Sequence, residues 1–239
     1  MVRLWLSALL LIAFTGAASA HGIWIAQRHG QLAVIYGHGG SDEAYDPSKL
    51  KQAAAYSADD VTLEVAVERN TNHATLAMPK EAIAATAFFD NGYWTQGPDD
   101  KWVNQSRDTV DGAKKSGRYL KYASVILGKR GTAPKPRGLR LEIVPLVDPM
   151  ALNPGDRLPI QVLHNGTPIP KVPVTSEYTT DSQNKSVVTD ENGRAEIIIR
   201  NLGLNVIAVS FTEETREDPK ADKIGMFSTL SFTLDYGEE

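Results

Sequence analysis

Three of the five histidines lie close together near the start of the chain, at His21, His29 and His38. Imidazole nitrogens suit divalent nickel, cobalt, copper and zinc. If residue 21 were the first residue of a processed chain, it would offer a free α-amine beside its own ring, and the two nitrogens could chelate one ion. A second imidazole would complete the three-nitrogen arrangement called a histidine brace. This pattern predicts a metal site with His21 and His38 as its main ligands.

Supporting ligands are available on both sides of His38. That residue stands between glycines just past a short apolar run, where the backbone leaves an imidazole accessible. The acidic loop that follows carries Asp42 and Glu43, whose carboxylates could add an oxygen ligand or attract a cation. We expect His29, Asp42 and Glu43 to support the site. A solvated side chain without a role is the competing interpretation for each of them.

Other chemistries find less support in the sequence. The chain has no cysteine, which excludes disulfides and thiolate metal sites, and its four methionines are scattered, which argues against a methionine-rich copper(I) carrier. We find no nucleophile elbow, phosphate-binding loop or zinc-protease motif. His73 and His164 lie far along the chain, and we expect neither to bind metal. The sequence therefore predicts a binding protein and not an enzyme.

Residues 1–20 have the pattern of a secretory signal peptide. Arg3 supplies the positive start, residues 4–14 form an apolar run too short to span a bilayer, and Ala18-Ser19-Ala20 is a small-x-small cleavage site. Cleavage after Ala20 would make His21 the first residue. We therefore expect an exported protein, in the periplasm of a Gram-negative host, with no membrane anchor after cleavage.

Charge and length limit the remaining classes. The 239-residue chain has a formal net charge of −4 and no basic block, so we expect no nucleic-acid partner. This length fits one large or two smaller domains.

The first half of the chain predicts a β-rich domain over residues 21–137. Short apolar runs on either side of His29 predict a hairpin. Its strands would be residues 23–26 and 31–36, and further strands are expected at 61–67, 73–78, 83–89 and 119–127. Residues 48–56 have a composition compatible with a short helix, and Asp90-Asn91-Gly92 predicts a turn.

The second half predicts a separate β-sandwich over residues 138–239. Residues 129–138 are rich in proline, glycine and basic side chains, as linkers are. Seven short strand patterns follow at regular spacing, which is typical of immunoglobulin-like or transthyretin-like sandwiches. They lie at residues 139–145, 157–163, 172–178, 185–189, 195–200, 205–213 and 226–235. The fold class expected for the whole chain is all-β.

Several segments resemble a family of exported bacterial proteins labelled as the periplasmic, substrate-specific component of nickel or cobalt uptake systems. The matching segments run in order along the chain: His21-Gly22-Ile23-Trp24, Tyr36-Gly37-His38-Gly39, Phe89-Asp90-Asn91-Gly92-Tyr93-Trp94, Leu141-Glu142-Ile143-Val144-Pro145 and Thr189-Asp190-Glu191-Asn192-Gly193-Arg194-Ala195. The resemblance implies a divalent-metal role, with nickel or cobalt as the ion and a membrane uptake transporter as the partner.

One alternative ion and two alternative functions stay open at this point. Ligand type alone favours copper at least as much as nickel or cobalt, because copper binds such sites most tightly. A copper-loaded brace could also activate oxygen, which makes an exported copper oxygenase the enzymatic alternative. A non-catalytic adaptor at the cell envelope, built on the β-sandwich, is the third candidate.

Overall fold

The computed structural model describes residues 21–185, 187–215 and 218–235, and these residues form an all-β protein, as the sequence predicts. Among them, no helix has the length and apolar character needed to cross a membrane. The expected signal peptide lies outside the described residues. The strands of the first half are β1 (Gly22–Arg28), β2 (Gln31–Gly37), β3 (Leu50–Ser57), β4 (Thr62–Leu63), β5 (Ala66–Arg69), β6 (Ala74–Ala77), β7 (Ala82–Gln96), β8 (Trp102–Val103) and β9 (Lys115–Ile126).

The second half contributes eight more strands to the described structure. They are β10 (Leu141–Pro145), β11 (Arg157–His164), β12 (Thr167–Pro168), β13 (Pro173–Thr175), β14 (Val187–Val188), β15 (Arg194–Ile198), β16 (Gly203–Glu214) and β17 (Lys223–Leu234). Each of the seven predicted strand patterns overlaps one of these strands. Among the described residues, the helical elements are three short 3-10 turns, η1 (Pro47–Lys49), η2 (Arg107–Thr109) and η3 (Pro149–Ala151).

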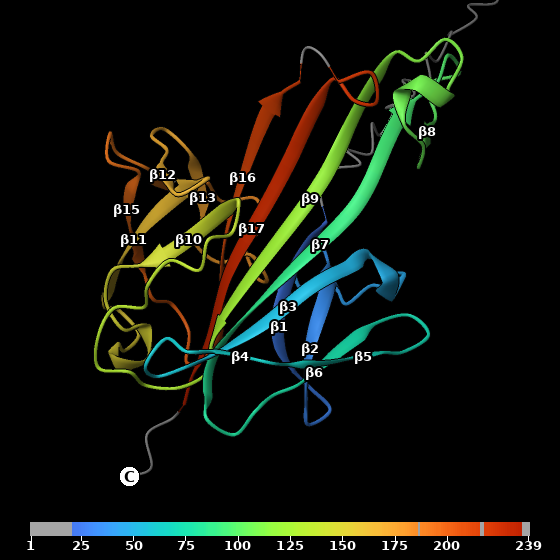
Figure 1. Ribbon diagram of the computed structural model, residues 1–239. Helices are drawn as coiled ribbons and strands as arrows, with labels where there is room; N and C mark the ends of the chain where they lie inside the picture. Colours follow the sequence, from blue (N-terminus) through green and yellow to red (C-terminus); the bar gives the residue numbers. More distant parts are fainter. Residues whose placement is uncertain (1–20, 186, 216–217, 236–239) are drawn as a thin grey trace, which may run out of the picture.

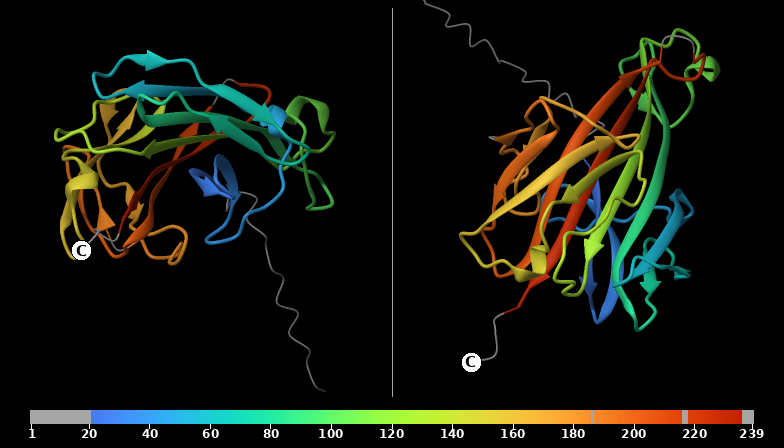
Figure 2. Two further views of the ribbon diagram at one scale, coloured as in Figure 1. Left: turned by 90° about the horizontal axis from the view of Figure 1, so that it is seen from below. Right: turned by 60° about the vertical axis from the view of Figure 1, so that its left-hand side comes forward.

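A nine-stranded sheet forms the middle of the molecule. Its order is β14-β13-β16-β17-β9-β7-β3-β4, and β8 pairs with the far end of β7. All neighbours are antiparallel except β9 and β17, which run parallel over nine paired residues from Arg118–Ile224 to Ile126–Phe232. Figure 2 shows this sheet as a curved layer, with the β1–β2 hairpin lying against its hollow side.

Two smaller sheets cover the two faces of the nine-stranded sheet (Figure 1). On one face, β10, β11 and β15 pack their apolar side chains against β16, β17 and β9, which gives a β-sandwich core. On the other face, the sheet β1-β2-β6-β5 packs against β3, β7 and β9. The alternation of side chains along β9 therefore supplies residues to both cores, with Leu120 and Tyr122 in the first and Ala123 and Val125 in the second.

The β1–β2 hairpin is buried on both of its faces. Ile23 and Ile25 join the core formed with β3, β7 and β9, whereas Trp24 and Ala26 face Tyr178 and strands β16 and β17. This explains why β1 reads as a continuous apolar run and not as an alternating pattern. At the predicted turn, His29 and Gly30 both have a positive φ, as a two-residue hairpin turn of type I′ requires.

Three sequence-based predictions are wrong in detail. Residues 48–56 form no α-helix, since Ser48 and Lys49 belong to the 3-10 turn η1 and the rest to β3. Strand β3 pairs with β7 through small side chains such as Ala53 opposite Ala87, and this pairing outweighs helix propensity. Asp90-Asn91-Gly92 is no turn between strands but an irregularity inside β7, where the register with β9 shifts and Gly92 has φ +80°. The strand expected at residues 61–67 is split into β4 and β5.

The segment with linker composition is held in place by side chains. Asp60 forms ion pairs with Arg130, with Lys135 at 3.0 Å and with Arg137 at 2.9 Å. The guanidinium of Arg137 also stacks on the ring of Tyr56 at 4.1 Å. The segment lies between β9 and β10, yet the nine-stranded sheet continues across it, because β9 of the first half pairs with β17 of the second. The two domains that were predicted to meet at residue 137 thus share one sheet.

Candidate functional site

The open end of the β1–β2 hairpin brings two of the predicted ligands to neighbouring positions. Gly22 pairs with Gly37 as the last pair of the hairpin, so His21 and His38 are the next residues on the two strands. The hydroxyl of Tyr178 bridges this pair, accepting a hydrogen bond from the Gly22 N–H at 3.0 Å and donating one to the Gly37 carbonyl at 3.1 Å. The hairpin end is therefore fixed by a residue of the second half.

The ring of His21 is held on two sides. It stacks on the ring of Tyr36, with centroids 5.1 Å apart and planes inclined by 2°. Its Nε2 lies 2.8 and 3.0 Å from the two carboxylate oxygens of Glu43. A carboxylate accepts hydrogen bonds, so Nε2 carries the proton, and in the neutral ring the lone pair is then on Nδ1. Within the described chain, Nδ1 has no hydrogen-bond partner.

Glu43 is positioned by the loop that follows His38. Its backbone N–H donates to the Tyr36 carbonyl at 2.7 Å, and its carboxylate accepts from the Ser41 hydroxyl at 3.2 Å. Burial, with a smaller contribution from the negative charge of Glu43, raises the pKa of Tyr36. Tyr36 therefore stays a neutral aromatic surface beneath the His21 ring.

A buried amine lies beneath the first described residue. The Lys121 side chain, 3% exposed, comes from the middle of β9, and its Nζ donates a hydrogen bond to the carbonyl oxygen of His21. The rings of Tyr36 and Phe227 each lie 5.8 Å from Nζ. Burial, with a smaller contribution from the charge of Lys49, lowers the pKa of Lys121 to about 7.

The imidazole of His38 contacts Tyr178 and the loop that follows it. Its Nε2 is 3.2 Å from the amide nitrogen of Gln183 and 3.4 Å from the Ser182 hydroxyl. Its ring meets the ring of Tyr178 edge-on at 6.0 Å. The sequence thus predicts the neighbouring backbone positions of His21 and His38, but the two rings contact different parts of the molecule.

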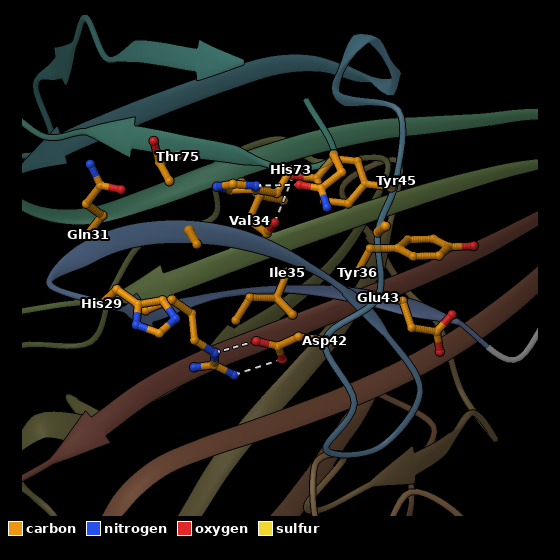
Figure 3. A pocket seen from close by; sticks show the side chains of 14 residues that line it. His29, Gln31, Val34, Ile35, Tyr36, Asp42, Glu43, Tyr45, His73 and Thr75 are labelled. Carbon is orange, nitrogen blue, oxygen red and sulfur yellow. Dashed lines mark hydrogen bonds and ion pairs between the residues drawn. The ribbon is translucent and has the colours of Figure 1, made fainter. Parts of the chain in front are cut away.

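The other predicted ligands lie along a cavity of about 260 Å³ beside β2 (Figure 3). Asp42 is bound by Arg28, whose Nε and terminal nitrogen lie 2.6 and 3.1 Å from its two oxygens. His29, in the hairpin turn, and Glu43 lie at opposite ends of this cavity, with Asp42 between them. His73 also lines the cavity, where Asn70 and Asn72 hydrogen-bond its two ring nitrogens.

Side chains alone do not build a complete metal centre at this site. Among the described residues, no group of three or more histidine, aspartate or glutamate side chains is arranged to hold a metal ion. A metal at His21 would therefore need a main-chain nitrogen as one of its ligands. In the uncleaved chain this nitrogen belongs to a peptide bond, and only cleavage before His21 would make it an amine.

Sequence reasoning missed two residues of the site, Lys121 and Tyr178. A signal for the first was present, because Lys121 interrupts the apolar pattern of residues 119–127, where both faces of the strand are buried. Tyr178 gave no such signal. Its contact with Gly22 spans 156 positions and depends on how the second half packs against the hairpin.

Residues 18–213 match the model of a domain of unknown function, DUF4198. The chain belongs to this family. A similar protein of Haemophilus influenzae, described as an uncharacterized protein, is 28% identical over 219 residues, which cover 90% of this chain and 91% of the relative. No solved structure matches the chain. The DUF4198 description names no activity.

Proposed function

We propose that this DUF4198 protein is an exported divalent transition-metal-binding protein that assists nickel or cobalt uptake. In this proposal, signal-peptide cleavage makes His21 the first residue, and His21 binds the ion through its α-amine and Nδ1. The single observation that carries the proposal is the contact between Glu43 and Nε2 of His21. Metal-binding histidines commonly donate their second ring N–H to a carboxylate, which fixes the ring and leaves the other nitrogen for the ion.

His38 is the proposed third nitrogen ligand. The pairing of Gly22 with Gly37 puts its backbone next to that of His21 across the hairpin. Metal binding would require its ring to turn from Ser182 and Gln183 toward His21. Gly39 follows His38 with a positive φ of 59°, a backbone conformation that glycine adopts without strain.

The remaining predicted ligands take supporting roles in the proposal. Glu43 orients His21 and is not itself a ligand, since it binds the nitrogen that faces away from the chelate. Asp42 is paired with Arg28, and His29 lies at the far end of the cavity, so both act at most through charge and access. Nickel or cobalt as the ion, and a membrane uptake transporter as the partner, rest on the family resemblance. The ligand set by itself would accept copper equally well.

The test is a calorimetric titration of the processed protein, its His21 terminus confirmed by mass, with Ni(II), Co(II) and Cu(II). We expect one site per chain that is weakened strongly by one extra alanine before His21 and by His38→Ala. His164→Ala is the matched control, because that ring packs on Phe211 in the second half. Equal binding with and without the extra alanine contradicts the chelate, and absence of binding leaves the envelope adaptor as the better function.

A further inference from the structure

Lys121 is an unusual residue for the core of a β-sheet. Its register neighbours on the two sides are Phe89 and Phe227, and it lies 3% exposed among aromatic rings. No acidic side chain in the described part of the chain forms an ion pair with it, and the charge that affects it most, on Lys49, has the same sign. Burying an amine without an anionic partner is costly, and an apolar side chain of similar volume would cost less at this position.

The one hydrogen bond described for this amine goes to the carbonyl oxygen of His21. That carbonyl and the N–H of Gly22 belong to the same peptide unit, and the N–H is bonded to the Tyr178 hydroxyl. A peptide unit is planar, so holding both of its polar groups fixes the whole plane. The backbone just after residue 21 is therefore held from two sides by Lys121 and Tyr178.

Residue 21 then keeps little freedom of its own. Stacking on Tyr36 and the bond to Glu43 fix its ring, and the fixed peptide plane sets the direction in which its Cα–C bond leaves the sheet. We propose that Lys121 is a positioning residue that holds the first peptide unit, so that the α-amine and Nδ1 of His21 are presented together in one chelating geometry. This inference rests on the proposed function. Its physical basis is preorganisation, which lowers the entropy lost on binding.

The chain contains no cysteine, which allows the amine at this position to be removed and restored chemically. Lys121→Cys has a single thiol. Alkylation of the unfolded chain with 2-bromoethylamine, followed by refolding, rebuilds a lysine-like amine. Alkylation with 1-iodopropane gives a side chain of nearly the same shape without the amine. The two products differ in one polar group and serve as matched controls for each other.

Both products are titrated with Cu(II) and compared by calorimetry and by their Cu(II) EPR spectra. We expect the propyl form to bind at least about tenfold more weakly than wild type, as losses of outer-sphere contacts do, with a changed spectrum. The aminoethyl form should recover wild-type affinity and spectrum. If wild type binds the ion and the two products bind equally well, the role assigned to Lys121 is wrong.

A metal-free measurement separates this inference from the proposed function. The backbone order parameter of the Gly22 amide is measured by ¹⁵N relaxation in both products, and we expect it to fall in the propyl form only. If this order parameter falls in the propyl form but wild type binds no metal, Lys121 positions the terminus and the proposed function is wrong. If the order parameter is the same in both products, the positioning role is overturned, regardless of the metal-binding result.

Discussion

The hydroxyl of Thr229 donates a hydrogen bond of 2.8 Å to the carbonyl oxygen of Ile23, a residue 206 positions earlier. Two residues along both strands, Ser231 makes the same contact with Ile25 at 2.7 Å. These two hydroxyl groups of β17 thus bind backbone carbonyls of β1, which is an edge strand of its own sheet. The strand β17 belongs to the nine-stranded sheet, whose face packs against β1. The hairpin that carries His21 is fixed to the central sheet by these side chains.

Thr229→Val tests this attachment. The substitution keeps the shape of the side chain but leaves the buried Ile23 carbonyl without that donor, which costs about 1–3 kcal/mol of unfolding free energy. Urea denaturation measures the loss. Thr212→Val, on the exposed face of β16, is the control and should change the unfolding free energy by less than about 0.5 kcal/mol. Equal effects of the two changes would mean that the hydroxyl does not hold β1.

Asp60 should make the protein sensitive to acid. Its hydrogen bond from Arg130, with the charges of Lys135 and Arg137, holds its pKa well below the usual range of an aspartate. The folded state therefore binds the proton more weakly than the unfolded state does. The resulting stabilisation is fully present above about pH 4, the unfolded pKa, and is lost as the pH falls through that value toward the folded pKa.

Asp60→Asn removes the titrating group, so the variant should be less stable than wild type at pH 7 but should lose less stability between about pH 5 and pH 2. Denaturation midpoints across this range measure the difference. Asp111→Asn, at an exposed position outside the cluster, should follow the wild-type curve. Parallel curves for wild type and Asp60→Asn would show that the cluster does not couple to folding.

Tyr178→Phe removes the hydroxyl that bridges Gly22 and Gly37 and leaves the ring in place. We expect faster amide hydrogen exchange at Gly22 and a loss of about 1–3 kcal/mol in unfolding free energy, because two buried backbone groups lose a partner. The control is Tyr119→Phe, since the Tyr119 hydroxyl has no hydrogen-bond partner among the described residues. Unchanged exchange at Gly22 would contradict the bridging role.

Glu43→Gln should weaken metal binding under the proposed function. A neutral amide holds the Nε2 proton of His21 less strongly, and loss of such outer-sphere partners costs about 10–100-fold in affinity. Titration with Ni(II) measures the change. Asp42→Asn is the matched control one residue away, and it should have the smaller effect because Asp42 is bound to Arg28. A larger loss of Ni(II) affinity in Asp42→Asn than in Glu43→Gln would assign the orienting role to Asp42.

Local patterns predicted much of the fold. The apolar runs and the His29-Gly30 turn predict the β1–β2 hairpin. The regular spacing of apolar patterns predicts the strands of the second half. The strand at residues 50–57 could not be predicted, because its alanines favour a helix by themselves. They form a strand only because small side chains of β7 pair with them in the folded protein. Within the site, Glu43 follows His21 by 22 positions and the hairpin brings them together. Lys121 follows His21 by 100 positions, and only the completed sheet makes that contact.

The parallel pairing of β9 with β17 also has a consequence for the order of folding. A nascent chain that has reached residue 137 holds β9 with one edge unpaired, and the strand that covers this edge is the last one in the described chain. Contacts of such long sequence separation form slowly, and an open apolar sheet edge can pair with another chain in the meantime. The first half therefore depends on the last described strand to complete its fold, and loss of β17 by truncation should make the protein prone to aggregation.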